Sequence, residues 1–205
     1  MRPTRALSLT GLLLVPMVSW GFSYETPSIT PEVGSGFEEK PGWAAETFAV
    51  AAANPLATDA GYQVLKAGGN AIDAAVAVQM VLTLVEPQSS GIGGGAFLMH
   101  FDGADVQAYD GRETAPATVT GELFMENGEP LPFMDAVASG LSVGVPGTVR
   151  MLEQAHAEHG QLPWRELFTP AITLAEEGFA VSQRLHTSLA NDEALRQNER
   201  ARAFY

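Results

Sequence analysis

The chain of 205 residues contains no cysteine, which excludes disulfides, thiol catalysis and cysteine-ligated zinc. Basic residues are also scarce, because 11 Lys and Arg stand against 24 Asp and Glu, a formal net charge of −13. A surface with this balance repels phosphate backbones and anionic lipids, so we expect no nucleic-acid partner. With 46% hydrophobic residues and only 17% charged ones, the composition still predicts a globular protein with a sizeable core.

Long hydrophobic runs are lacking as well. Residues 6–18 form an apolar run that follows Arg2 and Arg5 and precedes small residues ending at Ser23. At about 13 residues, this run is too short to cross roughly 30 Å of hydrocarbon as a helix. The layout is typical of a secretory signal peptide, although it has no clean A-x-A cleavage site. We therefore expect residues 1–23 to be a signal peptide, with no membrane anchor, and the protein to be periplasmic or secreted.

The rest of the chain divides into a leader and a domain. Proline and glycine are frequent in residues 24–42, which predicts a flexible leader. Residues 43–205 then form the folded part. Its first segments are a short buried strand, predicted over residues 47–53, and an amphipathic helix, predicted over residues 57–69.

A second helix is predicted between Asn70, which can cap it, and Pro87, which ends it. Its residues are apolar or small on nearly every side, so we expect it to be buried against a sheet. Asp73 and its limited length argue against a membrane span. Residues 96–110 then predict two strands joined by a hairpin turn at Asp102-Gly103.

The remaining residues have helical patterns. One helix is predicted from Gly147 to a stop at Gly160, and another over residues 163–178 with an interruption at Pro170. A last helical pattern, residues 191–205, has no stop signal. We interpret this ending as a coding region that was cut short.

Gly91, Gly93 and Ala96 match the G-x-G-x-x-A spacing of a dinucleotide-binding turn. That turn needs a strand before it and a helix after it, because the pyrophosphate sits on the N-terminal amides of the helix. Here a helix precedes the glycines and a strand follows them. We therefore expect a loop whose backbone needs positive φ angles or a close approach to another segment.

The stretch Gly140–Gly144 matches the G-x-S-x-G pattern that would make Ser142 a nucleophile. Such an elbow runs from a strand directly into a helix, whereas Pro146 and Gly147 open the next helical pattern two residues too late. Too few residues remain to place an acid and a histidine in that fold. We expect Ser142 to be a loop residue.

His156 and His159 have the H-x-x-H spacing of a metal-binding pair on a helix. No third ligand is evident in the sequence. The neighbours Glu153, Gln154 and Glu158 indicate a solvated helix face, so we expect no metal site.

Arg112 follows the predicted hairpin, in the stretch YDGRETAP. A planar guanidinium can bind a carboxylate through two parallel hydrogen bonds and so fix its orientation. From the residues alone, two interpretations stay open. Arg112 either binds an anionic ligand or forms a surface ion pair with Glu113 or Asp110.

Several stretches in a fixed order closely resemble the N-terminal part of γ-glutamyltransferases, also called γ-glutamyltranspeptidases or glutathione hydrolases. The resemblance covers about residues 43 to 200, and no single stretch would carry it alone. The stretches are NPLATDAGYQVLKAGGNAIDAAVAVQMVLTLVEPQSSGIGGGAFLM, DGRETAP, GVPGTV and LFTPAITLAEEGF.

The resemblance implies an α+β fold of the N-terminal-nucleophile hydrolase type, an αββα sandwich in which two sheets are stacked between layers of helices. Members of this family cut themselves into a large and a small subunit, and the new N-terminal threonine of the small subunit attacks the γ-carbonyl of glutathione or a related γ-glutamyl compound. No cofactor or metal is implied. The family's arginine in the R-E-x-A-P stretch grips the α-carboxylate of the γ-glutamyl group, and Arg112 has this position.

The family's Thr-Thr-His nucleophile stretch occurs nowhere in these 205 residues. The resemblance therefore implies that this chain holds no catalytic nucleophile and is the front part of a large subunit, with the small subunit as its partner and the sandwich incomplete. Two alternatives stay open. One is a β-lactam acylase on a similar scaffold, and the other is a truncated, non-catalytic chain that binds a partner or ligand.

Overall fold

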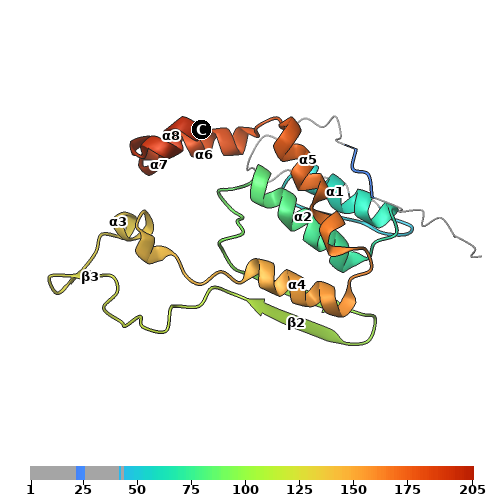
Figure 1. The fold of residues 1–205 in the computed structure, drawn as a ribbon, viewed down its shortest axis with the longest axis horizontal. Coiled ribbons are helices and arrows are strands. Elements are labelled where there is room, and N and C mark those ends of the chain that lie inside the picture. Colours follow the sequence, from blue (N-terminus) through green and yellow to red (C-terminus); the bar gives the residue numbers. More distant parts are fainter. Residues whose placement is uncertain (1–21, 26–41, 43) are drawn as a thin grey trace, which may run out of the picture.

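The computed structural model describes residues 22–25, 42 and 44–205 (Figure 1). The predicted signal peptide and leader lie almost entirely outside these residues, so the boundaries at residues 23 and 42 stay predictions. The elements are, in chain order, α1 (Pro55–Lys66), α2 (Ala71–Val85), β1 (Ala96–Phe101), β2 (Val106–Gly111), β3 (Met125–Glu126), β4 (Glu129–Pro130), α3 (Phe133–Val137), the 3-10 turn η1 (Gly140–Ser142), α4 (Thr148–His159), the 3-10 turn η2 (Trp164–Phe168), α5 (Thr169–Glu177), α6 (Gln183–Asn191), α7 (Glu193–Gln197) and α8 (Glu199–Phe204).

Both N-terminal helices begin at side-chain caps. Asn54 accepts a hydrogen bond from the backbone of Leu56 at the start of α1, and Pro55 occupies the first turn. At the start of α2, Asn70 and Asp73 form a reciprocal capping box. Between the helices, Gly68 has a φ of +93°, which glycine adopts without strain. Local sequence thus determines where these two helices begin and where the chain turns between them.

Helix α2 is the centre of the core, so its predicted burial is confirmed, but the described elements that contact it most are helices and not the predicted sheet. It contacts α1, α4, α5 and η2, so helices cover it on several sides (Figure 1). Its fully buried positions include Val76, Ala77 and Val81. No helix in the described part of the chain is long and apolar enough to cross a membrane.

Strands β1 and β2 form the predicted antiparallel hairpin, with Ala96 opposite Gly111 and Phe101 opposite Val106. The turn contains Gly103 at a φ of +104°. Helix α4 packs against the hairpin, and Tyr109 of β2 joins Met151 of α4 in the core. The hairpin therefore has one covered face.

The other face of β1 is apolar and uncovered within the described residues. Phe97, Met99 and Phe101 alternate along the strand with half-buried neighbours and are 64% to 69% exposed. Exposed apolar patches of this kind are typical of surfaces that contact another protein segment.

The prediction of a buried strand over residues 47–53 was wrong. The segment alternates between exposed and half-buried residues, but it has no partner strand in the described part of the chain. Its one hydrogen bond there runs from the backbone of Ala52 to the hydroxyl of Thr58, at 3.2 Å. The backbone is extended, but no neighbouring strand in the described part of the chain pairs with it or buries it.

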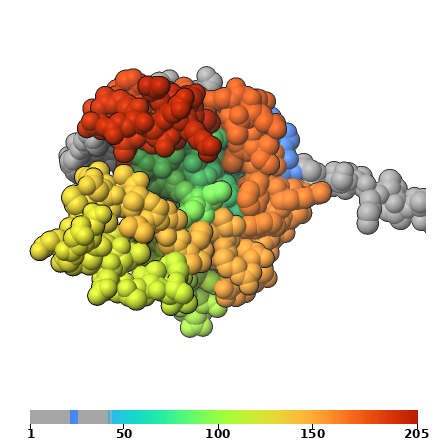
Figure 2. All heavy atoms as spheres, turned by 60° about the vertical axis from the view of Figure 1, so that its left-hand side comes forward, coloured from blue at the N-terminus to red at the C-terminus, as the bar shows by residue number. Residues whose placement is uncertain are grey.

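The C-terminal predictions were partly right. Gly147 and Gly160 flank α4 as expected. Pro170 does not interrupt a helix but lies in the first turn of α5, after the separate turn η2. The last helical pattern is divided into α7 and α8 at Asn198, whose side chain caps α8. In Figure 2 these C-terminal helices and the segment with α3 and β3 form separate bulges, with residues around α2 visible between them.

Candidate functional site

Three segments far apart in the sequence meet at Arg112. Thr114 and Val145 form an isolated antiparallel bridge, with Val145 N 2.8 Å from Thr114 O. The carbonyl oxygen of Gly94 accepts hydrogen bonds from the backbone N–H groups of Gly147 and Thr148, each at 3.2 Å. The glycine-rich loop, the strand end at Arg112 and the start of α4 are therefore held together by backbone hydrogen bonds.

Glycine is required where these segments touch. A Cβ atom on Gly95 would lie 2.7 Å from Glu113 N and 2.8 Å from Gly111 O, and one on Gly144 would lie 2.9 Å from Glu113 Cβ. These distances are shorter than the contacts that a Cβ atom makes with other atoms in folded proteins. The close approach that we expected in the glycine loop thus occurs at Gly95 rather than at Gly91 or Gly93, which have free space around them. No glycine of this loop has a positive φ.

The side chain of Arg112 is 68% exposed, and its Nε lies 3.5 Å from Glu113 Oε2. Its backbone N–H donates to the Asp110 carboxylate at 2.9 Å. The ion pair with Glu113 is thus present, but such exposed pairs contribute little to stability. The guanidinium makes no hydrogen bond to another described residue, so its donors remain available to an anion.

Glu113 is the residue that the sequence interpretation missed, since it was considered only as a surface partner of Arg112. Its side chain is 29% exposed. The Oε2 atom is shielded from solvent and accepts no hydrogen bond within the described residues. A shielded carboxylate oxygen without a donor costs free energy. Together, Arg112 and Glu113 present a positive and a negative group side by side, which complements a ligand bearing both an anionic and a cationic group.

Ser142 lies in a turn, as predicted. It ends η1, and its hydroxyl lies 2.9 Å from the carbonyl oxygens of Val137 and Ser139. It has no histidine among its hydrogen-bond partners in the described part of the chain. The prediction of a loop role is consistent with this geometry.

The two histidines of α4 do not lie on a solvated face, so that expectation was wrong. His156 Nε2 is 2.9 Å from the carbonyl oxygen of Leu162 and 3.4 Å from the buried carboxylate of Asp73. The ring of His159 stacks on His100 with centroids 4.2 Å apart. Among the described residues, no group of three or more His, Cys, Asp or Glu side chains could hold a metal ion.

His159 also belongs to a polar cluster between α4 and the hairpin. The Tyr109 hydroxyl donates to Glu158 at 2.7 Å and lies 2.8 Å from His159 Nε2. Burial, and then the hydrogen bond and negative charge of Glu158, raise the pKa of Tyr109 to about 12. The hydrogen bond from Tyr109 in turn lowers the pKa of Glu158. This cluster joins two elements of the fold and lies outside the Arg112 site.

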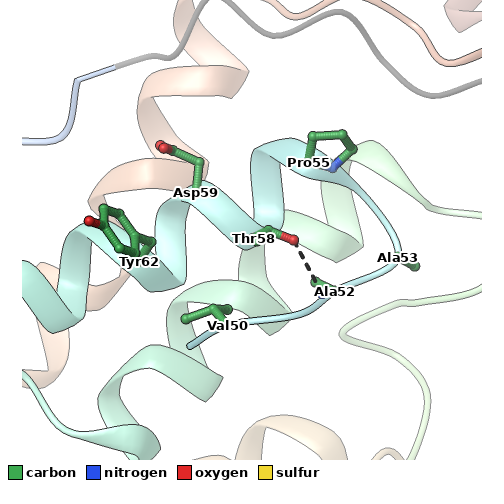
Figure 3. Close-up of a pocket in the computed structure, with 7 residues that line it drawn as sticks. All are labelled: Val50, Ala52, Ala53, Pro55, Thr58, Asp59 and Tyr62. Carbon is green, nitrogen blue, oxygen red and sulfur yellow. Dashed lines mark hydrogen bonds between the residues drawn. The ribbon is translucent and has the colours of Figure 1, made fainter. Parts of the chain in front are cut away.

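A cavity of about 360 Å³ lies between α1 and the extended segment before it (Figure 3). Its polar residues are Thr58, Asp59 and Tyr62, and the rest of its lining is apolar. Burial raises the pKa of Asp59. Among the described residues, its lining has no cationic side chain and no residue of the Arg112 site, so these residues do not share that site's anion-binding chemistry.

The model of the gamma-glutamyltranspeptidase family matches residues 57–205. The chain belongs to the gamma-glutamyltranspeptidase family. The match includes every segment that meets at Arg112, as well as most of α1, all of α2 and the hairpin.

Individual family members support the assignment. The chain is 42% identical to a glutathione hydrolase proenzyme of Bacillus subtilis over 194 aligned residues. The alignment covers 93% of this chain and 33% of that protein. It is 48% identical over 131 residues to glutathione hydrolase 2 of Arabidopsis thaliana, covering 63% of this chain and 22% of that protein. The chain thus spans about a third or less of the length of these relatives.

Solved structures confirm the fold class. The gamma-glutamyltranspeptidase of Helicobacter pylori has a TM-score of 0.74 and 36% identity, covering 78% of this chain and 47% of that one. A cephalosporin acylase of Bacillus halodurans has a TM-score of 0.55 and 28% identity, covering 79% of this chain and 33% of that one. These are N-terminal-nucleophile hydrolases, and the described residues of this gamma-glutamyltranspeptidase family member hold part of that α+β fold.

Proposed function

We propose that this chain is the large-subunit part of an enzyme that transfers the γ-glutamyl group of glutathione and related compounds to water or amino acids. The observation that carries the proposal is the pair Arg112 and Glu113, held on a frame of backbone hydrogen bonds. Membership of the family and the proenzyme name of a relative with 42% identity support it.

The chemistry of the pair fits the donor. A γ-glutamyl group carries a free α-carboxylate and a free α-ammonium on one carbon atom. The guanidinium of Arg112 would hold the carboxylate through paired hydrogen bonds, and the carboxylate of Glu113 would accept from the ammonium. Binding both groups fixes the α-carbon and therefore the direction in which the distant γ-carbonyl points.

The nucleophile would come from outside these residues. In the proposed reaction, the hydroxyl of a threonine at the start of the small subunit adds to the γ-carbonyl, and its amino group takes the hydroxyl proton. The amino group then gives this proton to the amide nitrogen, the C–N bond breaks, and the leaving group departs as an amine. Water or an amino acid then releases the γ-glutamyl group from the threonine. The part of Arg112 and Glu113 is to bind and orient the donor throughout, without exchanging protons with it.

The surface of the chain supports the small subunit as a partner. A groove of about 750 Å³ lies between residues 48–51 on one side and β1 on the other, with α2 as its floor. In the described part of the chain, residues 48–51 have no partner strand, and β1 is paired with β2 along one edge only. Strands from the rest of a proenzyme would pair with these backbone groups and cover the apolar residues of β1.

A β-lactam acylase is the second candidate, because the cephalosporin acylase shares the fold at a lower TM-score and identity. The pair of opposite charges favours an amino-acid-like donor over a β-lactam side chain that lacks one of the two charges. The third candidate, a non-catalytic chain, would give no role to the Glu113 Oε2 atom, which has an ion pair with Arg112 but no hydrogen bond within the described residues.

The test is turnover by the full-length protein. We expect it to hydrolyse a chromogenic γ-glutamyl anilide and not to release the side chain of a cephalosporin. We expect the isolated 205-residue chain to hydrolyse neither, because it has no threonine nucleophile. Cephalosporin turnover without γ-glutamyl turnover would replace the proposal by the acylase. If the processed full-length protein has neither γ-glutamyl nor cephalosporin turnover, the non-catalytic chain is the remaining candidate.

Export is a separate proposal, supported by the charged, apolar and small residues at the N-terminus. Mass spectrometry of the protein from the periplasm or medium should show that residues 1 to about 23 have been removed. An intact Met1 on the exported protein would contradict it.

A further inference from the structure

The carboxylate of Glu86, at the C-terminal end of α2, is inside the protein, with its side chain only 4% exposed. It has three donors. Its Oε2 accepts hydrogen bonds from Arg184 Nη1 at 2.7 Å and from Gln88 Nε2 at 2.6 Å. Its Oε1 accepts one from Asn54 Nδ2 at 3.2 Å. A buried carboxylate is tolerated only when it is paired in this way. The network therefore joins α6, the end of α2 and the cap of α1.

The same arginine also holds the loop that follows α2. Arg184 Nη2 donates to Ser89 Oγ at 2.9 Å, while the carbonyl oxygen of Glu86 accepts from Ser89 N and Ser90 N at 2.9 Å and 3.0 Å. Gln79 of α2 donates to Ser90 Oγ at 2.5 Å. The upstream half of the loop, residues 86–90, is thus fixed by side chains from two helices.

The downstream half of the loop leads into the Arg112 site. The Gly94 carbonyl is bonded to the start of α4, and Gly95 lies against Glu113. Between the two fixed ends are Gly91 and Gly93, which have more backbone freedom than other residues. A glycine loop keeps one conformation only when its two ends are held, and Arg184 is the charged group that holds the upstream end.

We propose that Arg184 is a positioning residue for the Arg112 and Glu113 site. By clamping Glu86 and Ser89 it sets the path of the glycine loop, and through Gly95 it sets the position of the Glu113 carboxylate. The proposal rests on the function proposed above. Helix α6 has no residue in the Arg112 and Glu113 site, but through Arg184 it would affect donor binding there.

A simple role in attaching α6 is separable from this one. The helix has its own anchor, because Leu185 is 3% exposed and its backbone N–H is capped by Ser182 Oγ at 3.1 Å. Arg184→Met therefore removes the clamp and leaves α6 attached. It also leaves the buried charge of Glu86 uncompensated, and Glu86→Gln in the same protein removes that charge.

The experiment compares the full-length wild type with Arg184→Met, the double variant Arg184→Met with Glu86→Gln, and Ser89→Ala. Arg196→Met is the matched control, because Arg196 is exposed on α7 and has no ion pair among the described residues. Thermal unfolding, KM and kcat for a γ-glutamyl anilide, and amide hydrogen exchange are measured on each protein.

The double variant should unfold near the wild-type temperature and still show a KM about 3- to 30-fold higher, with a smaller change in kcat. The amides of residues 91–95 should exchange faster than in the wild type, while those of α2 keep their protection. Ser89→Ala, which retains the buried ion pair and alters only an exposed residue, should show the same faster exchange to a lesser degree. Arg196→Met should match the wild type.

Wild-type KM and wild-type exchange of the loop in a stable double variant would overturn the proposal. A double variant whose KM returns to the wild-type value together with its unfolding temperature would also overturn the proposal. Arg184 would then affect KM only through the stability of the protein. If the wild type has no γ-glutamyl turnover, the proposed function fails, and loop exchange alone decides: faster exchange supports the clamp, and unchanged exchange overturns it.

Discussion

The hydroxyl of Thr148 donates a 3.0 Å hydrogen bond to the carbonyl oxygen of Gly94, although 54 residues separate them in the chain. Thr148 is buried in the first turn of α4, and Gly94 lies in the loop before β1. This contact holds the glycine loop against Glu113, next to Arg112. The candidate site therefore depends on tertiary packing as much as on its two charged residues.

Arg112→Lys and Arg112→Gln should both weaken donor binding in the full-length enzyme. Lysine keeps the charge but loses the paired geometry, and glutamine loses both. A hydrogen bond to a charged group contributes about 1.5 to 3 kcal/mol, or about 10- to 150-fold in affinity. The loss should appear mainly as a higher KM, with some loss of kcat from poorer alignment.

Self-cleavage of the Arg112 variants should be normal, because that step involves no free α-carboxylate. Arg150→Gln is the control, since Arg150 is exposed on α4 and pairs with Glu153. Steady-state kinetics on processed enzymes checks the prediction. If both Arg112 variants keep the wild-type KM and kcat, Arg112 is only a surface residue.

Glu113→Gln should raise KM selectively for donors with a free α-ammonium group. A hydrogen bond to a charged group contributes about 1.5 to 3 kcal/mol, so KM should rise about 10- to 150-fold for such donors. A donor acetylated on the α-amino group has no ammonium to lose, so the variant should change its KM little. Kinetics with the two donors measures this difference, with the exposed Glu153→Gln as control. Equal losses for both donors would contradict an ammonium contact.

Gly95→Ala should destabilise the protein, because the added methyl group would meet Glu113 N at 2.7 Å and Gly111 O at 2.8 Å. Overpacking of this kind costs about 1 to 3 kcal/mol in the free energy of unfolding. Gly121→Ala is the matched control, since nothing lies within 4 Å of the added atom. Urea unfolding of both variants tests the prediction, and equal stabilities would show that the segments can move apart without cost.

Tyr109→Phe should lower the free energy of unfolding by about 0.5 to 1.5 kcal/mol at neutral pH, because the hydroxyl loses Glu158 and His159 as partners. The pKa of Tyr109 is raised from 10.0 to about 12, so the folded state favours the neutral phenol. That stabilisation is complete below pH 10 and is lost as the pH rises toward about 12. The difference between wild type and variant should therefore shrink across this range.

Urea unfolding at neutral pH and between pH 10 and 12 measures the effect of Tyr109→Phe. Tyr62→Phe serves as the matched control for loss of a tyrosine hydroxyl, since Tyr62 is 45% exposed. A difference between wild type and Tyr109→Phe that stays constant with pH would mean that the phenol of Tyr109 is not shielded.

The sequence alone determined the features that arise within a few residues of the chain. The caps at Asn54 and Asn70 follow from side chains that bond to nearby backbone, and the turn at Gly103 follows from glycine's freedom at positive φ. The order of the motifs indicated the family, and the position of Arg112 in its motif made it the candidate anion-binding residue.

Tertiary structure decided the features that depend on distant segments. The extended residues 47–53 have the alternation of a strand but no neighbour with which to pair. His156 and His159 have polar neighbours in sequence, yet in the structure His156 contacts Asp73 and His159 contacts His100. The position of Glu113 against Gly95 likewise follows from hydrogen bonds between the loop and α4. Local propensity acts over one or two turns of chain, whereas burial and charge environment depend on which segments pack together, and only the folded structure specifies that.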